Sequence, residues 1–112
     1  MVKPNIGRLL IVDDETELMT VLCETLDARG YRTSGFTSAK EALEHFKKEE
    51  YDLLLTDLMM PDMDGIAFLK AALEIDPGLI GIMMTGQGTV QTAVEAMKTG
   101  AFDYILNLRI AL

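Results

Sequence analysis

The sequence contains no tryptophan, one cysteine, one histidine and three prolines, and these scarcities narrow the class of protein that it can encode. Cys23 has no partner for an internal disulfide, so the fold is not a disulfide scaffold. We expect Cys23 to be a core residue in a reducing, cytoplasmic setting rather than a reactive thiol. Long apolar runs are also lacking. None approaches the ~20 residues of a membrane span, and residues 1–8 contain no signal-peptide core, so no membrane association is expected.

Positive charge is scarce as well. The 112 residues include ten lysines and arginines against eighteen aspartates and glutamates, which gives a formal net charge of −8. Because nucleic-acid binding needs clustered basic residues, this balance argues against nucleic acid as a partner and allows cations or basic proteins. His45 lies among charged residues and is expected on a solvated helix face. With 49% hydrophobic residues, residues 1–112 are expected to form one folded domain.

Short aliphatic runs alternate with amphipathic helical patterns along the chain. Ser38 to Glu41 has the pattern of a capping box, and Gly30 and Gly100 stand where helices should end. Nearly apolar strands in a β-α order indicate an α/β fold with a parallel sheet covered on both faces. Strands are predicted at residues 9–12, 53–56, 79–84 and 102–106, and a weaker strand is predicted at residues 31–36.

Two of the predicted strands end directly in carboxylates. Asp57 follows the third strand, and Asp13, Asp14 and Glu15 follow the first. If the two strands are neighbours in one parallel sheet, their carboxyl ends meet at one edge and bring at least three acids into one pocket. Crowding tends to raise carboxylate pKa values, and a divalent cation relieves the repulsion. Oxygen ligands without a nearby cysteine or histidine favour Mg²⁺ or Mn²⁺ over zinc.

Asp57 is a candidate nucleophile at this edge. Beside a metal ion, an anionic carboxylate could attack phosphorus in line, and the hydroxyl of Thr85, after the fourth strand, could bind a phosphoryl oxygen. The alternative is structural: the acids from Asp13 to Glu15 would stabilise a helix N-terminus, and Asp57 would start a turn. Polar residues at three strand ends together favour a site.

Four short motifs in a fixed order and spacing carry a family resemblance. They are Leu10-Ile11-Val12-Asp13-Asp14-Glu15, Asp57-Leu58-Met59-Met60-Pro61-Asp62-Met63-Asp64-Gly65, Met84-Thr85-Gly86 and Ala96-Met97-Lys98-Thr99-Gly100-Ala101-Phe102-Asp103-Tyr104. With these motifs the chain resembles, over residues 8–106, the receiver domain of two-component response regulators, especially the receivers of NtrC-type transcriptional activators. The resemblance implies a flavodoxin-like, doubly wound sheet of five parallel strands in the order 2-1-3-4-5.

The resemblance also implies a role for each acid. Asp57 would accept a phosphoryl group from a sensor histidine kinase. Asp14 and Asp57 would ligate Mg²⁺ directly, together with the backbone carbonyl of Met59, and Asp13 would act through water. Such a domain catalyses only its own phosphorylation and dephosphorylation and is not a conventional enzyme. Thr85 would bind the phosphoryl oxygen and move, and Tyr104 would change rotamer with it and remodel the face around the fourth helix and fifth strand.

The sequence departs from the family pattern after the fifth strand. Asn107 stands where family members usually carry lysine, and Leu108 stands where they carry proline. Loss of a lysine–phosphate contact would remove roughly 1.5–3 kcal/mol of bias toward the active state, although Asn107 can still donate a neutral hydrogen bond. The chain also stops where the family's last helix begins. We therefore expect a C-terminally truncated receiver with a bare apolar face, and a homodimer is one way to cover it.

Two further functions stay open at this point. A degenerate receiver would act as a protein-interaction module that does not switch, and Asn107 motivates this alternative. A Mg²⁺-dependent phosphohydrolase with an aspartyl nucleophile is less well supported. Such enzymes typically carry a second acid two residues after the nucleophile, where this chain has Met59.

Overall fold

The computed structural model describes residues 7–86 and 88–106, and within them the chain alternates five strands with four helices. The predicted elements are all found, and the strand ends differ from the prediction by at most one residue. The elements are β1 (Arg8–Val12), α1 (Thr16–Ala28), β2 (Arg32–Phe36), α2 (Ala39–Phe46), β3 (Leu53–Thr56), α3 (Gly65–Ile75), β4 (Ile80–Thr85), α4 (Val90–Thr99) and β5 (Asp103–Leu106).

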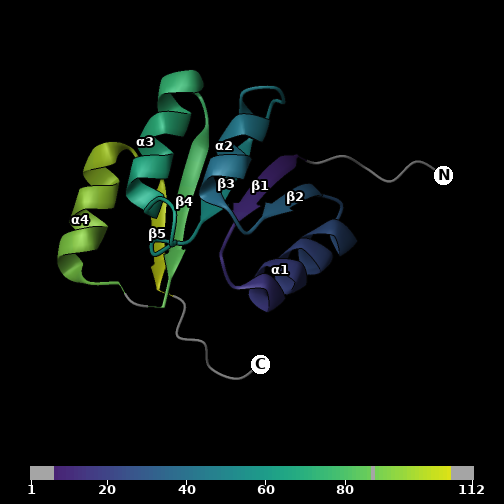
Figure 1. Cartoon of the computed structure of the whole chain (residues 1–112), viewed down its shortest axis with the longest axis horizontal. Helices are drawn as coiled ribbons and strands as arrows, with labels where there is room; N and C mark the ends of the chain where they lie inside the picture. Colours follow the sequence, from purple (N-terminus) through teal and green to yellow (C-terminus); the bar gives the residue numbers. More distant parts are fainter. Residues whose placement is uncertain (1–6, 87, 107–112) are drawn as a thin grey trace.

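The five described strands form one parallel sheet in the order β2-β1-β3-β4-β5, which confirms the flavodoxin-like topology (Figure 1). The register places Val12 beside Thr56, and Thr56 beside Met83. Thr85 lies beside Leu106 at the end of the next pair. The carboxyl ends of β1, β3 and β4 are therefore neighbours, and loops that follow these strands share one edge of the sheet.

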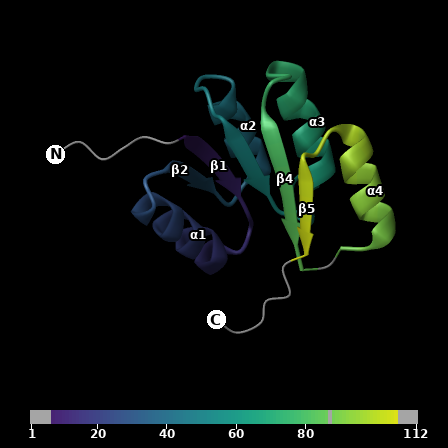
Figure 2. The same ribbon diagram turned by 180° about the vertical axis from the view of Figure 1, so that it is seen from behind.

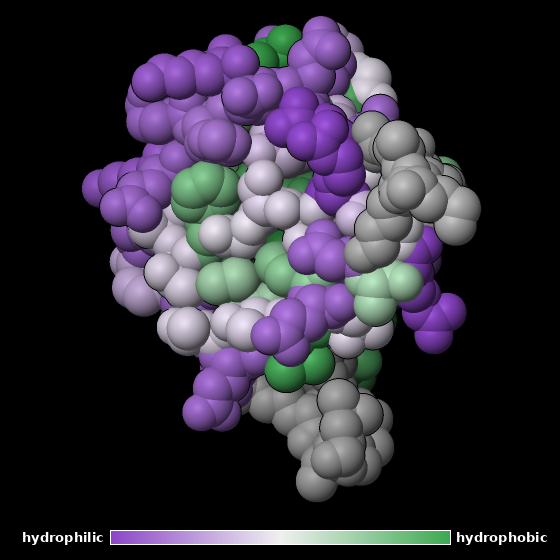
Figure 3. All heavy atoms as spheres, turned by 90° about the vertical axis from the view of Figure 1, so that its right-hand side faces the viewer, coloured by the Kyte–Doolittle hydropathy of each residue, from purple (hydrophilic) through white to green (hydrophobic). Residues whose placement is uncertain are grey.

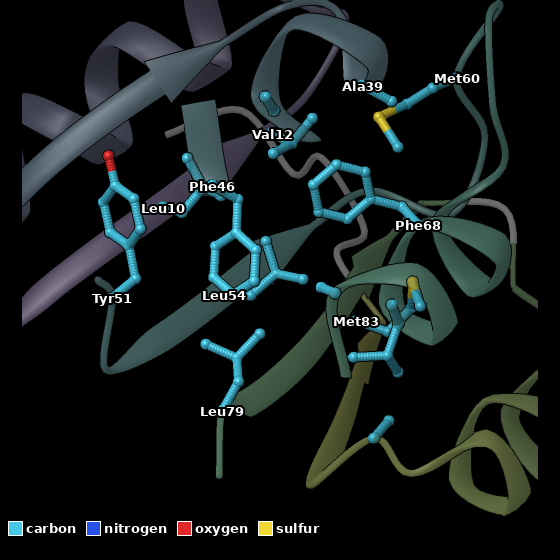
Figure 4. Close-up of a cluster of buried hydrophobic side chains, with 14 of the residues drawn as sticks. Leu10, Val12, Ala39, Phe46, Tyr51, Leu54, Met60, Phe68, Leu79 and Met83 are labelled. Carbon is cyan, nitrogen blue, oxygen red and sulfur yellow. The ribbon is translucent and has the colours of Figure 1, made fainter. Parts of the chain in front are cut away.

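Two unequal layers cover the sheet. Figures 1 and 2 show α2, α3 and α4 together on one face, while α1 lies over β1 and β2 on the other. The main core lies under the larger layer, where Phe68 of α3 is fully buried and points toward Val12 of the sheet (Figure 4). None of the described helices is long and apolar enough to cross a membrane.

The opposite face is only partly covered. Side chains alternate across a strand, so the register groups Leu9, Ile80 and Ile105 on the face that carries α1. Leu9 is buried beside α1, but Ile80 and Ile105 are 42% and 43% exposed. No residue of α1 itself is fully buried, and Val21 on this helix is 46% exposed. The described residues after β4 contribute no helix to this face, which leaves the apolar surface expected from the sequence.

The edge formed by β2 is held by close packing against α1. Gly35 of β2 has no side chain, and a Cβ atom there would collide with the sulfur atoms of Met19 and Cys23. Cys23 is half-buried in this contact, and burial raises the pKa of its thiol, so it remains neutral as a packing residue. In the view of Figure 3, white residues of intermediate hydropathy and green hydrophobic residues lie near the centre of this face, interspersed with some purple hydrophilic residues and bordered by more of them.

The expectation that His45 lies on a solvated helix face was wrong. His45 is half-buried rather than on a solvated face. Its ring lies 5.1 Å from the ring of Phe36 and 5.9 Å from that of Tyr51, centroid to centroid. The charged neighbours in sequence are exposed, whereas the His45 ring packs against aromatic rings from β2 and from the segment before β3. An imidazole ring can fill an apolar corner as an aromatic side chain.

Candidate functional site

The structure brings Asp13, Asp14 and Asp57 together at the carboxyl edge of the sheet. One carboxylate oxygen from each residue lies within 4.8 Å of the others. Asp13 continues β1 and donates its backbone N–H to the carbonyl of Phe36 at 3.1 Å. Asp57 continues β3 in the same way, with its N–H bonded to the carbonyl of Val12 at 2.9 Å. Backbone hydrogen bonds to neighbouring parallel strands thus hold the main chain of both acids in place, side by side at the end of the sheet.

Burial and mutual repulsion perturb two of these acids. Asp13 is 7% exposed, and burial raises its pKa from 3.8 to about 6. The Glu15 backbone N–H, which donates to Asp13 Oδ1 at 2.8 Å, opposes this rise, and the charges of Asp57 and Asp14 add to it. Burial also raises the pKa of Asp57, against hydrogen bonds donated to it by Leu58 and Met59 N–H groups.

This donor set fits a hard divalent cation. Three carboxylates crowd one small region, all their donor atoms are oxygen, and two of them have raised pKa values because their negative charges are poorly solvated and repel one another. No histidine or sulfur ligand joins the cluster among the described residues. A bound cation would offset both the poor solvation of the carboxylates and the repulsion between them.

The β3–α3 loop, residues 57–64, is held tightly at its base. Gly65 donates its N–H to the carbonyl of Leu58 at 2.8 Å. A Cβ atom at Gly65 would collide with the carbonyl oxygen of Asp57, so only glycine allows this close approach. Met59 lies two residues after Asp57, and this residue is 56% exposed. Its backbone carbonyl is the group of this residue that could serve as a ligand.

Thr85 lies at the carboxyl end of β4 and is 2% exposed. Its side chain forms a hydrogen bond with Asp57, which favours the charged carboxylate and so lowers the pKa of Asp57. The structure therefore links the fourth strand's hydroxyl to the third strand's acid. Asn107, at the usual lysine position, lies outside the described residues.

Tyr104 is not part of the acid cluster. It lies in β5, half-buried, and its hydroxyl is 2.9 Å from the hydroxyl of Thr92 in α4. Thr92 also forms a capping box with Thr89, in which each residue's backbone N–H donates to the other's side chain. The ring packs against Gly88, where a Cβ atom would collide with the phenol. Tyr104 is thus tied to the N-terminus of α4.

Asp62 is a contact that sequence reasoning missed. Its carboxylate accepts a hydrogen bond from the Ser38 hydroxyl at 2.9 Å and one from the Lys40 N–H at 3.0 Å. Both groups belong to the start of α2. The capping pattern at Ser38 is present in part, since Ser38 Oγ accepts the N–H of Glu41 at 3.3 Å. The hydrogen bond from the Lys40 N–H has the largest effect on the pKa of Asp62. Together with the bond from the Ser38 hydroxyl, it holds this pKa below its usual value. No local pattern signals a contact across more than twenty residues.

Comparison with known proteins agrees with this architecture. The family model of the response regulator receiver domain matches residues 9–107. The transcriptional regulatory protein ZraR of Escherichia coli is 41% identical over 98 residues, which is 88% of this chain and 22% of ZraR. The DNA-binding transcriptional regulator NtrC of Proteus hauseri is 37% identical over 99 residues, which is 88% of this chain and 21% of NtrC. The chain therefore spans about a fifth of the length of these relatives.

Solved structures show the same fold. A CheY-like response regulator receiver domain protein from Methanospirillum hungatei superposes with a TM-score of 0.88 at 33% identity, covering 92% of this chain and 82% of that one. A response regulator from Burkholderia pseudomallei, solved with a phosphorylated aspartic acid, a calcium ion and citrate, has a TM-score of 0.85 at 26% identity. That match covers 89% of this chain and 59% of the other.

Proposed function

Because this chain belongs to the response regulator receiver domain family, we propose that it is a phosphoacceptor switch that takes a phosphoryl group on Asp57 from a sensor histidine kinase. Receivers of NtrC-type activators are among its relatives. The observation that carries the proposal is the position of Asp57, within 4.8 Å of Asp13 and Asp14 at the edge where β1 and β3 end. A carboxylate that is partly buried, rigidly held and open to a second charged group suits attack on phosphorus.

Asp14, Asp57 and the Met59 carbonyl would hold Mg²⁺ or Mn²⁺ directly, and Asp13 would hold it through water. Bound there, the ion supplies positive charge that offsets the charge of the acids and of the phosphoryl oxygens. Asp57 Oδ forms the new bond to phosphorus as the bond from phosphorus to the kinase histidine nitrogen breaks, and the electron pair stays on that nitrogen. The Thr85 hydroxyl then hydrogen-bonds a phosphoryl oxygen.

The response to phosphorylation would run through Thr85 to Tyr104. If Thr85 turns to the phosphoryl group, it vacates space beside β5, and Tyr104 can leave its contact with α4. The surface around α4 and β5 that this movement would change includes large apolar residues that are already exposed. These are Val90 at 83%, Val94 and Met97 at 47% each, and Phe102 at 69%. An apolar surface that changes shape with Tyr104 is suited to binding a partner protein in one state.

Further parts of the proposal concern the setting of the domain. We place residues 1–112 in one receiver domain that works in the cytoplasm, where sensor kinases present their phosphohistidine. The partly bare face that carries Ile80 and Ile105 could be covered by a second copy of the chain as a homodimer. With a net charge of −8, the chain itself is not expected to bind nucleic acid.

Incubation with Mg²⁺ and acetyl phosphate, followed by intact-mass analysis, tests the function. The chain should gain the mass of one phosphoryl group, and Asp57→Asn should gain none. Asp76→Asn is the matched control, since Asp76 follows the C-terminal end of α3 and its carboxylate accepts only the Gly78 N–H among the described side-chain contacts. If the unchanged chain gains no mass, the second function is favoured, namely a non-switching interaction module consistent with Asn107 in place of lysine.

A further inference from the structure

The carboxylate of Asp62 joins two segments of the chain. Asp62 belongs to the β3–α3 loop, yet its hydrogen-bond donors lie at the start of α2. Oδ2 accepts the Ser38 hydroxyl at 2.9 Å and the Lys40 N–H at 3.0 Å, and Oδ1 accepts the Ala39 N–H at 3.3 Å. These groups are 22 to 24 positions away in sequence. The loop that follows Asp57 is thus fastened to a neighbouring helix as well as to its own base.

The contact is more than an alternative cap for α2. Ser38 is already the N-cap residue and accepts the Glu41 N–H. Asp62 satisfies different donors, the N–H groups of Ala39 and Lys40, which otherwise have no partner within the helix. Its negative charge also faces the positive end of the helix dipole, which is a favourable place for a carboxylate. The lowered pKa of Asp62 agrees with a carboxylate that these hydrogen bonds hold in its charged form.

An apolar contact supports the same attachment. Met60, two residues before Asp62, is 9% exposed, and Ala39 at the start of α2 is fully buried. Figure 4 shows the Met60 side chain lying beside Ala39. The loop therefore touches the first turn of α2 with a buried side chain and with a bonded carboxylate. At its base, the Gly65 N–H to Leu58 carbonyl bond closes it.

Met59 lies between these attachment points. We propose that Asp62 is a positioning residue, which ties the β3–α3 loop to α2 and so holds the main chain at Met59 beside Asp57 and its neighbouring acids. This inference rests on the proposed function, in which the Met59 carbonyl binds the metal. It assigns to α2, which contributes no ligand, a share in setting metal affinity.

Calorimetric titration with Mg²⁺ tests the inference on the wild-type chain, Asp62→Ala, Ser38→Ala and the double variant. Asp62→Ala should weaken Mg²⁺ binding about tenfold, as the loss of a residue that orients a ligand commonly does. Ser38→Ala changes no charge, yet it removes one donor to Asp62 and should weaken binding in the same direction. The double variant should bind no more weakly than Asp62→Ala alone, because both residues act through one contact.

Controls separate position from charge and from stability. Asp76→Ala removes the same charge from a carboxylate that accepts the Gly78 N–H at 2.9 Å, and it should leave Mg²⁺ binding unchanged. The backbone amide resonance of Met59 in metal-free protein gives a second readout, and it should shift in Asp62→Ala and Ser38→Ala alike. If Asp62→Ala does not fold, Asp62→Asn replaces it with a milder loss of bonding.

Three results would overturn the inference. Wild-type Mg²⁺ affinity in both Asp62→Ala and Ser38→Ala, with a lower melting temperature, would mean that the contact serves stability alone. Weaker binding in Asp62→Ala with no effect of Ser38→Ala would reduce the role of Asp62 to its charge. A wild-type chain that binds no Mg²⁺ would remove the proposed function itself and the inference with it, and so is distinguished from the first two outcomes.

Discussion

Asp13→Asn should make the metal-free protein more stable at neutral pH. Burial and neighbouring acids raise the pKa of Asp13 from 3.8 to about 6, so ionising this group costs more in the folded than in the unfolded chain. The difference corresponds to about 3 kcal/mol between the two protonation states, and sharing of the repulsion with Asp14 and Asp57 reduces the gain to about 1–3 kcal/mol. Asparagine keeps an oxygen for the Glu15 N–H bond and loses only the charge.

The sign of the pH dependence follows from the same shift. Between pH 4 and 7 the folded state binds more protons than the unfolded state at Asp13, so stability falls as pH rises through this range. Urea unfolding with a chelator present should give Asp13→Asn its full advantage at pH 7.5 and little of it at pH 4. Added Mg²⁺ should then stabilise the wild type more than the variant. At saturating Mg²⁺ the difference should be about 1.4 kcal/mol for each tenfold by which the substitution weakens Mg²⁺ binding.

Two results would refute this reasoning. Asp13→Asn could prove no more stable than the wild type at pH 7.5 without metal, which would show that the acids are well solvated in the folded chain. Its advantage could instead persist undiminished at pH 4, where a protonated Asp13 carries no charge to remove. Asp76→Asn gives the baseline, since it deletes one charge of the same sign from outside the cluster.

Three further predictions concern the same edge of the sheet. Asp57→Asn should raise the metal-free melting temperature by several degrees while abolishing phosphorylation, and a lower melting temperature without Mg²⁺ would contradict carboxylate crowding. Thr92→Val should release the Tyr104 hydroxyl and change the NMR signals of its ring, whereas Thr99→Val, which breaks a bond to a helix carbonyl instead, should not. Gly65→Ala should cost about 2 kcal/mol or more in urea unfolding and weaken Mg²⁺ binding, since its Cβ displaces the Asp57 carbonyl; wild-type stability would refute that collision.

The sequence predicted the fold well because its signals are local. Aliphatic runs and apolar helical spacing mark most of the elements within a few positions, while β2, with no aliphatic run, gives only a weak signal. Gly30, expected to end α1, takes a φ of 101°, a conformation that favours glycine. The strand order came from the family resemblance, since several parallel orders are compatible with a β-α alternation. The strand-end position of Asp13 and Asp57 followed directly from the runs before them.

Contacts between distant segments were beyond the sequence. Asp62 looked like one of several acids in a turn, and nothing near it in the chain points to α2. His45 looked solvated because its neighbours are charged, although tertiary packing against Phe36 decides its environment. The bond between Tyr104 and Thr92 depends equally on how α4 lies against β5. Sequence patterns specify which face is apolar, and only the assembled layers specify what each polar group meets.

The limited burial of α1 has a consequence for the order in which parts of the chain unfold locally. Since no residue of α1 is fully buried, this helix exposes less apolar surface of its own on detaching than α3, which carries Phe68 and Leu69 in the core. Its amides should therefore exchange with solvent hydrogen sooner than those of α3. Asp13 and Asp14 lie just before Glu15, the N-cap residue of α1. Local detachment of this helix would therefore displace two of the three acids first. A bound cation that holds these acids in place would slow hydrogen exchange along the whole of α1.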